Sequence, residues 1–226
     1  MDYLSTSIDK KNWSILDIGC GSGYFLELAN KFGWQVYGAE LTNTLANEAK
    51  QRLATENVFH GRLKEARYPD DFFGAITLWD VLLMVDDPSR ELKECYRILR
   101  NGGILGIRVR NVLFQKFVYY AYLPFKAIGR KLGIKYPSVF HPYCFNSKSI
   151  DTLLSRLGFT NIQITNSPLT IGDPYGHVTI TGLVKILKHL TNLFSKAIFG
   201  LSRKKWIIGP SLLIWAEKPE KEDTLR

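Results

Sequence analysis

Residues 15–25, ILDIGCGSGYF, constrain the fold of this chain more than any other stretch. The apolar run at the start suits a strand that is buried on both faces of a parallel sheet. Glycines then occupy every second position, at Gly19, Gly21 and Gly23, and FLELANKF after them repeats apolar residues at helical spacing. The stretch therefore predicts a strand, a tight turn whose backbone a ligand can approach, and a helix with free N–H groups at its start.

The spacing of the glycines distinguishes between two nucleotide ligands. The dinucleotide fingerprint G-x-G-x-x-G places its third glycine five residues after the first. Here the third glycine comes four residues after the first, and Asp17 stands two residues before the first. This pattern, D-x-G-x-G-x-G, resembles motif one of the class I S-adenosylmethionine-dependent methyltransferases. A nicotinamide-dependent oxidoreductase is the rival interpretation, and the glycine spacing argues against it.

A second acid is expected at the end of the following strand, where it would bind ribose hydroxyls. QVYGAEL, residues 35–41, is a plausible strand that contains Glu40 near its end, roughly twenty residues after the glycines, as the fingerprint requires. A carboxylate accepts two hydrogen bonds at once and so suits a cis-diol. We predict that Glu40 binds the ribose; the alternative is a strand-end acid that only faces solvent.

The family resemblance extends over residues 13–168. FFGAITLWDVL at 72–82 looks like the family's fourth strand and the turn after it, and 88–107 looks like the next helix, an R-x-L-R-x-G-G turn and the fifth strand. HPYCF at 141–145, with NSKSIDTLLSRLGF after it, is similar to a segment of a bacterial subgroup. That subgroup is related to the ubiquinone-biosynthesis O-methyltransferases, and many of its members act on small molecules or on sugars of surface polysaccharides.

This resemblance implies a single α/β domain with a doubly wound, mostly parallel seven-stranded sheet of order 3-2-1-4-5-7-6 and helices on both faces. Its core would comprise about residues 13–168 and 211–218, where SLLIWAEK looks like the last, antiparallel strand. The implied cofactor is S-adenosyl-L-methionine. The implied cofactor-binding residues are Asp17, Gly19, Cys20, Gly21, Gly23, Glu40, Leu41, Leu63, Trp79 and Asp80. Of these, Leu63 would pack on the adenine, and Trp79 and Asp80 would face the methionine end.

Two positions depart from the family pattern. Many relatives have an acid next to the adenine-packing Leu, where this chain has Arg62. Glu65 is a candidate substitute acceptor for the adenine amino group. Many relatives also have a Glu-His pair where this chain has Leu83 and Met84. No cluster of His, Cys, Asp or Glu has the spacing of a metal site, so we predict no metal.

Methyl transfer from a sulfonium requires the enzyme to position the acceptor and to remove a proton where one must leave. Histidine is the usual base near neutral pH. His141 is the candidate catalytic residue because it opens the HPYCF segment; the alternative is a structural histidine bonded to backbone. Arg110, Asn111 and Tyr143 are the residues predicted to line the substrate pocket, and basic groups there would suit a phosphate or carboxylate.

The charge of the chain is strongly asymmetric. Residues 1–94 hold ten Lys/Arg and fifteen Asp/Glu, a balance of −5, whereas residues 95–226 hold twenty and six, a balance of +14. No acid occurs between Glu94 and Asp151. The asymmetry indicates an anionic partner for the basic part, and nucleic acid, an anionic membrane surface and a phosphorylated substrate all remain open.

Two segments in the basic part are additions to the fold. Residues 112–140 mix aromatic and basic side chains and would cover the substrate mouth, either as a helical lid or as a docking surface for a lipid-linked substrate. Residues 177–205 have apolar positions at helical spacing with lysines on the other faces, which indicates either a helix buried against the domain or one at an anionic membrane surface. No base-reading motif supports binding of nucleic acid.

Composition indicates the compartment. Three cysteines without a CxxC pair are typical of a reducing environment. MDYLSTSIDKKNW lacks the apolar core of a signal peptide, and no apolar run is long enough to span a bilayer. The sequence predicts a cytoplasmic protein, with peripheral membrane contact left open, and it does not indicate the oligomeric state.

Together these features predict a methyltransferase that uses S-adenosyl-L-methionine. Its acceptor would be a small or lipid-linked molecule that is anionic, and O-methylation is favoured. The alternative is a membrane-associated protein that keeps the fold and binds the cofactor but has lost catalysis. The departures at Arg62, Leu83 and Met84 are the residues that suggest this alternative.

Overall fold

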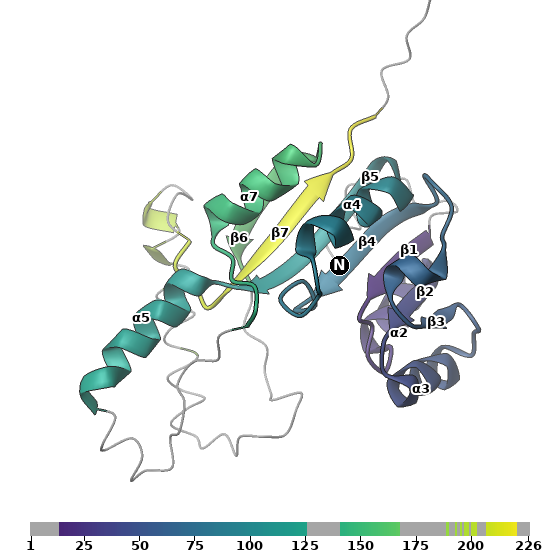
Figure 1. Cartoon of the computed structure of the whole chain (residues 1–226), viewed down its shortest axis with the longest axis horizontal. Helices are drawn as coiled ribbons and strands as arrows, with labels where there is room; N and C mark the ends of the chain where they lie inside the picture. Colours follow the sequence, from purple (N-terminus) through teal and green to yellow (C-terminus); the bar gives the residue numbers. More distant parts are fainter. Residues whose placement is uncertain are drawn as a thin grey trace, which may run out of the picture.

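Figure 1 shows a computed structural model of the protein. It describes residues 14–125, 141–167 and 207–220, together with 189, 193, 195, 197, 198 and 200–202. The strands are Ser14–Ile18 (β1), Gln35–Glu40 (β2), Val58–His60 (β3), Phe73–Trp79 (β4), Leu99–Arg110 (β5), Thr160–Asn166 (β6) and Ser211–Glu217 (β7). They form one sheet in the order β3-β2-β1-β4-β5-β7-β6, and β7 runs antiparallel to both of its neighbours. The predicted fold class and strand order are thereby confirmed.

Helices cover both faces of the sheet (Figure 1). The helices are Tyr24–Lys31 (α2), Asn43–Leu53 (α3), Pro88–Ile98 (α4), Val112–Tyr122 (α5) and Ser147–Arg156 (α7), with short 3₁₀ turns at Leu63–Ala66 (η1) and Leu123–Phe125 (η2). Helices α2 and α3 contribute buried side chains to one apolar cluster, and α4 and α7 contribute to the other. Because both faces are covered, β1 is buried along its whole length, which explains the apolar run in the sequence.

Local chemistry determines where the helices begin and end. Asp87 caps α4 by accepting hydrogen bonds from the N–H groups of Ser89 and Arg90, and Pro88 occupies the first helical position. Helix α2 ends at Lys31, and Gly33 follows with a φ of 85°, as expected of a glycine that stops a helix. These signals keep the connections short and bring the carboxyl ends of the parallel strands to one edge.

Residues 1–13, 126–140, most of 168–206 and 221–226 lie outside the described residues, and they include much of the two predicted additions, 112–140 and 177–205. The first part of the predicted lid is α5, which extends away from the sheet (Figure 1). The described residues between 189 and 202 are helical up to Leu201. There Leu201 is 85% exposed, whereas Ser195 is buried and its carbonyl accepts a hydrogen bond from the side-chain amide of Asn166.

No helix of the described residues is both long and apolar enough to cross a membrane.

Candidate cofactor and acceptor site

The glycine-rich turn follows β1 at the carboxyl edge of the sheet. Gly19, Gly21 and Gly23 all have positive φ, at 68°, 55° and 83°. A Cβ on Gly19 would lie 2.3 Å from Cγ2 of Val81, and one on Gly23 would lie 3.1 Å from Cβ of Ala49. A Cβ on Gly21 would meet nothing within 4 Å. The outer two glycines therefore allow close packing, whereas Gly21 leaves open space that a ligand can enter.

Glu40 links this turn to the end of β2. Its Oε2 accepts a 2.9 Å hydrogen bond from the N–H of Gly21, and its Oε1 accepts a 2.8 Å bond from the N–H of Thr42. The residue is only 8% exposed. A carboxylate has about four lone-pair sites, so each oxygen keeps capacity for a further hydroxyl donor. Glu40 thus holds two loops together and retains acceptors at the carboxyl edge, where we predicted ribose binding.

Asp17 lies beneath the turn, buried in β1. Its Oδ1 accepts a 2.7 Å hydrogen bond from the hydroxyl of Thr77 in β4. The pKa of Asp17 is raised to about 7: burial is the largest cause, the Thr77 hydrogen bond acts in the opposite direction, and the negative charge of Glu40 adds to the rise. Thr77 was not predicted as a site residue, although a hydroxyl within an otherwise apolar strand was a usable signal.

Cys20 lies within the turn and is buried. Its Sγ lies 2.7 Å from the position that a Cβ on Gly38 would take. Burial, followed by the charges of Asp17 and Glu40, raises the pKa of the thiol to about 12, so the side chain is neutral. Cys20 therefore packs the turn against β2.

The residues predicted to lie near the adenine differ from one another in exposure and in their contacts. Leu41 is 61% exposed beside Glu40, whereas Leu63 is 2% exposed and belongs to the core beneath η1. Arg62 forms an ion pair with Asp86, and Oε2 of Glu65 accepts a 2.9 Å hydrogen bond from the N–H of Arg62. Leu41 thus offers an accessible apolar surface near the glycine-rich turn, and Glu65 stabilises its own loop.

Trp79 and Asp80 lie at the end of β4, near the start of α2. The Trp79 ring makes edge contacts with Phe25 at 5.2 Å and Trp215 at 6.1 Å between centroids. Its indole Nε1 is buried and has no hydrogen-bond partner among the described residues. Asp80 has a φ of 62° and accepts a 2.9 Å hydrogen bond from Nε of Arg108. Arg108 was not predicted; as a charged residue near the end of an apolar strand, it carried a signal.

His141 is the first residue of the HPYCF segment, which is fastened near the carboxyl edge of the sheet. The hydroxyl of Tyr143 donates a 2.6 Å hydrogen bond to the carbonyl of Asp86. Phe145 is buried, and its carbonyl accepts a 2.9 Å hydrogen bond from the N–H of Val112. The segment is therefore fastened both to the loop after β4 and to the residues after β5, which places His141 between them.

The imidazole of His141 has two unlike nitrogens. Nδ1 lies 3.1 Å from Sδ of Met84, and Nε2 is buried without a hydrogen-bond partner among the described residues. Burial lowers the pKa of His141, the positive charge of Arg110 lowers it further, and Asp80 acts in the opposite direction. The ring therefore favours its neutral form near pH 7 and keeps one nitrogen for a ligand.

Arg110 and Asn111 have different roles from each other. Asn111 is 1% exposed and caps α5 through Leu113, and its amide donates to the carbonyls of Ile207 and Gly209. Its side chain thus positions α5 against the turn before β7. Arg110 is exposed and forms no ion pair within the described part of the chain, so its guanidinium is available to an anion.

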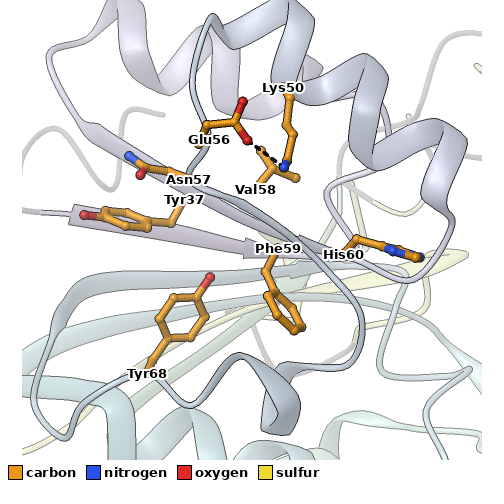
Figure 2. Close-up of a pocket in the computed structure, with 8 residues that line it drawn as sticks. All are labelled: Tyr37, Lys50, Glu56, Asn57, Val58, Phe59, His60 and Tyr68. Carbon is orange, nitrogen blue, oxygen red and sulfur yellow. Dashed lines mark hydrogen bonds and ion pairs between the residues drawn. The ribbon is translucent and has the colours of Figure 1, made fainter.

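A separate pocket of about 360 Å³ lies around the edge strand β3 (Figure 2). Its lining residues are Tyr37, Lys50, Glu56, Asn57, Val58, Phe59, His60 and Tyr68. Lys50 and Glu56 form a 2.7 Å ion pair across its upper side (Figure 2). None of the predicted site residues lines this pocket, so it is distinct from the glycine-rich turn.

The described residues contain no group of three or more His, Cys, Asp or Glu side chains arranged to hold a metal ion.

Comparison with known protein sequences identifies related chains. A family model for the methyltransferase domain matches residues 2–164. A ubiquinone biosynthesis O-methyltransferase of Coxiella burnetii is 28% identical over 123 residues, which are 53% of this chain and 53% of that protein. A probable S-adenosylmethionine-dependent methyltransferase of Mycobacterium tuberculosis is 26% identical over 150 residues, which are 66% of this chain and 50% of that protein. The chain therefore spans about half the length of the curated relatives it matches.

Solved structures share the fold. A possible histamine N-methyltransferase of Thermotoga maritima superposes with a TM-score of 0.56 at 20% identity, covering 92% of this chain and 83% of that one. Phosphoethanolamine N-methyltransferase 2 of Haemonchus contortus, in complex with S-adenosyl-L-methionine, has a TM-score of 0.60 at 20% identity and covers 96% of this chain and 51% of that one. At such identities the likeness establishes the fold alone.

Proposed function

Because the chain belongs to the methyltransferase domain family, we propose that it transfers a methyl group from S-adenosyl-L-methionine to a small or lipid-linked anionic acceptor, with oxygen as the favoured atom. The observation that carries this proposal is the arrangement of Gly21 and Glu40. The backbone at Gly21 faces open space, and its N–H is fixed by a carboxylate that keeps further acceptor capacity. This arrangement suits a nucleoside with a free cis-diol.

The chain's residues fit the cofactor in three further respects. The glycine-rich turn can lie close to the ligand, and exposed Leu41 can cover an apolar ring. The indole N–H of Trp79, which has no partner among the residues that the structure describes, can donate to a polar group. When bound, S-adenosyl-L-methionine supplies a methyl group already activated by its sulfonium. The protein's part is to hold the acceptor in line and to exclude water.

For an oxygen acceptor, His141 would take the hydroxyl proton at Nε2. Its lowered pKa keeps the imidazole neutral near pH 7, so the nitrogen is able to accept a proton. The exposed guanidinium of Arg110 would bind an anionic group of the same acceptor, because planar donors match phosphate and carboxylate. The Coxiella relative is named an O-methyltransferase, which is consistent with an oxygen acceptor.

Calorimetric titration with S-adenosyl-L-methionine and S-adenosyl-L-homocysteine tests the cofactor site. We expect micromolar binding that Glu40→Ala weakens tenfold or more, which corresponds to about 1.4 kcal/mol. Glu56→Ala is the matched control, because Glu56 is 88% exposed and lies at the separate β3 pocket. No binding by the wild-type protein would overturn the proposal. Binding without transfer to any acceptor would favour the alternative that catalysis has been lost.

The acceptor class is tested with pairs of molecules that differ only in an anionic group. The proposal predicts faster transfer to the anionic member of each pair. Arg110→Gln should remove that preference while leaving cofactor affinity unchanged. Equal rates for both members of every pair would exclude the anionic acceptor.

The exposed face of α5 supports a lipid-linked acceptor reached at an anionic membrane surface. Leu113, Phe117 and Tyr120 recur at helical spacing and are 55%, 70% and 65% exposed. Lys116 is exposed between them, and the sequence from 95 to 150 contains no acid. An apolar face with basic neighbours and no acids matches the chemistry of an anionic bilayer surface.

Sedimentation with vesicles tests this docking. We expect binding to phosphatidylcholine vesicles that contain phosphatidylserine, little binding without phosphatidylserine, and a loss of binding in Phe117→Ser. Phe32→Ser is the control, because Phe32 is 49% exposed at the end of α2. Equal sedimentation of Phe117→Ser and the wild-type protein would exclude α5 as the docking element.

A further inference from the structure

We propose that Met84 is a positioning residue that sets the tautomer of His141, so that Nδ1 carries the proton and Nε2 is the proton acceptor. This inference rests on the proposed role of His141. It is carried by the 3.1 Å contact between Nδ1 of His141 and Sδ of Met84, together with the buried Nε2, which has no hydrogen-bond partner in the described part of the chain.

The chemistry of the two partners determines the direction of this contact. A thioether sulfur has no hydrogen and can only accept, so the imidazole must be the donor. The proton is then on Nδ1 and the lone pair is on Nε2, because in a neutral imidazole one nitrogen donates and the other accepts. Met84 therefore takes the orienting role that a carboxylate has in a Ser-His-Asp triad.

Both sides of the contact are held in place. Leu82 and Leu83 are buried at 0% and 2% exposure, and the N–H of Met84 donates a 2.8 Å hydrogen bond to the carbonyl of Val81. On the other side, Tyr143 fastens the His141 segment to the carbonyl of Asp86 in the same loop. The His141–Met84 contact and the Tyr143–Asp86 hydrogen bond thus join the HPYCF segment to the loop after β4, and they keep the imidazole beside that loop.

A neutral orienting group has a consequence that a carboxylate would not have. The charged groups acting on His141 are Arg110, which lowers its pKa, and Asp80, which raises it and is paired with Arg108. Met84 adds no negative charge, so it orients the ring without stabilising the imidazolium. The result is an imidazole that is neutral and has its free lone pair at the buried nitrogen.

The proposal is tested by ¹⁵N NMR of the imidazole rings, which requires neither cofactor nor acceptor. The chain has four histidines, and His141→Gln identifies the signal of His141 by its disappearance. The wild-type protein should show His141 protonated at Nδ1 above its pKa. In Met84→Leu, which keeps the volume but has no acceptor, this preference should disappear while the other histidine signals stay unchanged.

Met84→Glu distinguishes orientation from simple packing. A carboxylate still accepts from Nδ1, so the tautomer should be kept. The negative charge of that carboxylate should raise the pKa of His141 by about one pH unit or more relative to the wild-type protein. An Nε2-protonated ring in the wild-type protein, or an unchanged tautomer in Met84→Leu, would overturn the proposal. Cofactor titration of Met84→Leu should match the wild-type protein, so failure of the NMR prediction is separable from failure of the methyltransferase function.

Discussion

The hydroxyl of Thr77 donates a 2.7 Å hydrogen bond to the carboxylate of Asp17, and both side chains are buried at the centre of the sheet. The two residues are opposite one another in the parallel pairing of β1 and β4. The contact supplies one polar partner to a carboxyl that burial otherwise leaves in an apolar layer. The Asp17 carboxyl therefore affects both the stability of the fold and the glycine-rich turn that follows β1.

Asp17→Asn should change how stability depends on pH. Burial raises the pKa of Asp17 from 3.8 to about 7, so between these values the native protein keeps a proton that the unfolded chain releases. The free energy of unfolding of the wild-type protein therefore falls as the pH rises from about 4 to 7. Relative to the wild-type protein, the variant should gain up to about 4 kcal/mol between pH 4 and pH 8. Urea unfolding at both pH values measures this gain, and an equal difference at both would contradict it.

Thr77→Val keeps the shape of the side chain and removes the hydroxyl donor. The Asp17 carboxyl then lacks the partner that lowers its pKa, so we expect that pKa to rise further. The free energy of unfolding at pH 8 should fall by about 1–3 kcal/mol. Thr160→Val at the exposed start of β6 is the control and should be near neutral. A Thr77→Val protein as stable as the wild-type protein would show that the hydrogen bond contributes little.

Alanine at Gly19 and at Gly21 should have different effects. Both positions have positive φ, which costs roughly 1–2 kcal/mol for a residue with a Cβ. Gly19→Ala would also press on Val81 at 2.3 Å and lose a further ~1–3 kcal/mol from overpacking. Gly21→Ala should lose less stability but weaken cofactor binding tenfold or more, because its methyl group would occupy the open space. Urea unfolding measures the loss of stability in each variant, and calorimetry measures its cofactor affinity. Unimpaired binding by Gly21→Ala would contradict the prediction that the cofactor lies against the backbone at Gly21.

Lys218→Met should destabilise the fold without affecting the cofactor site. Lys218 is 8% exposed, and its ammonium donates to the carbonyls of Tyr96 and Leu99 and to Oδ1 of Asp71. Removing a buried charged donor leaves its acceptors without that partner, and we expect a loss of about 2–4 kcal/mol. Cofactor affinity should be unchanged, because these contacts lie at the opposite edge of the sheet. Lys148→Met on α7 is the control for loss of a lysine, because Lys148 is exposed.

Much of the architecture could be predicted because its signals are local. An apolar run followed by glycines and a helical repeat specifies strand, turn and helix within a few residues, and the family resemblance supplied the strand order. In the described part of the predicted helix on 177–205, Leu201 is exposed and Ser195 is buried. Helical periodicity identifies an apolar face but does not tell what that face contacts.

The site was predictable to the extent that its residues belong to motifs. Glu40 lies beside the glycine-rich turn as its spacing indicated, and His141 lies near the end of β4. Which side chains pair with the site residues could not be predicted, because the partners are far apart in the sequence. Thr77 is 60 residues from Asp17, Met84 is 57 from His141, and Arg108 is 28 from Asp80.

The sequence by itself determined the order of elements and the residues of the glycine-rich turn, because both depend on interactions between near neighbours in the chain. Tertiary structure alone decided which side chains pair with Asp17, Asp80 and His141. Those pairings depend on the register between strands and on the path of the loops after them, which result from packing the whole sheet.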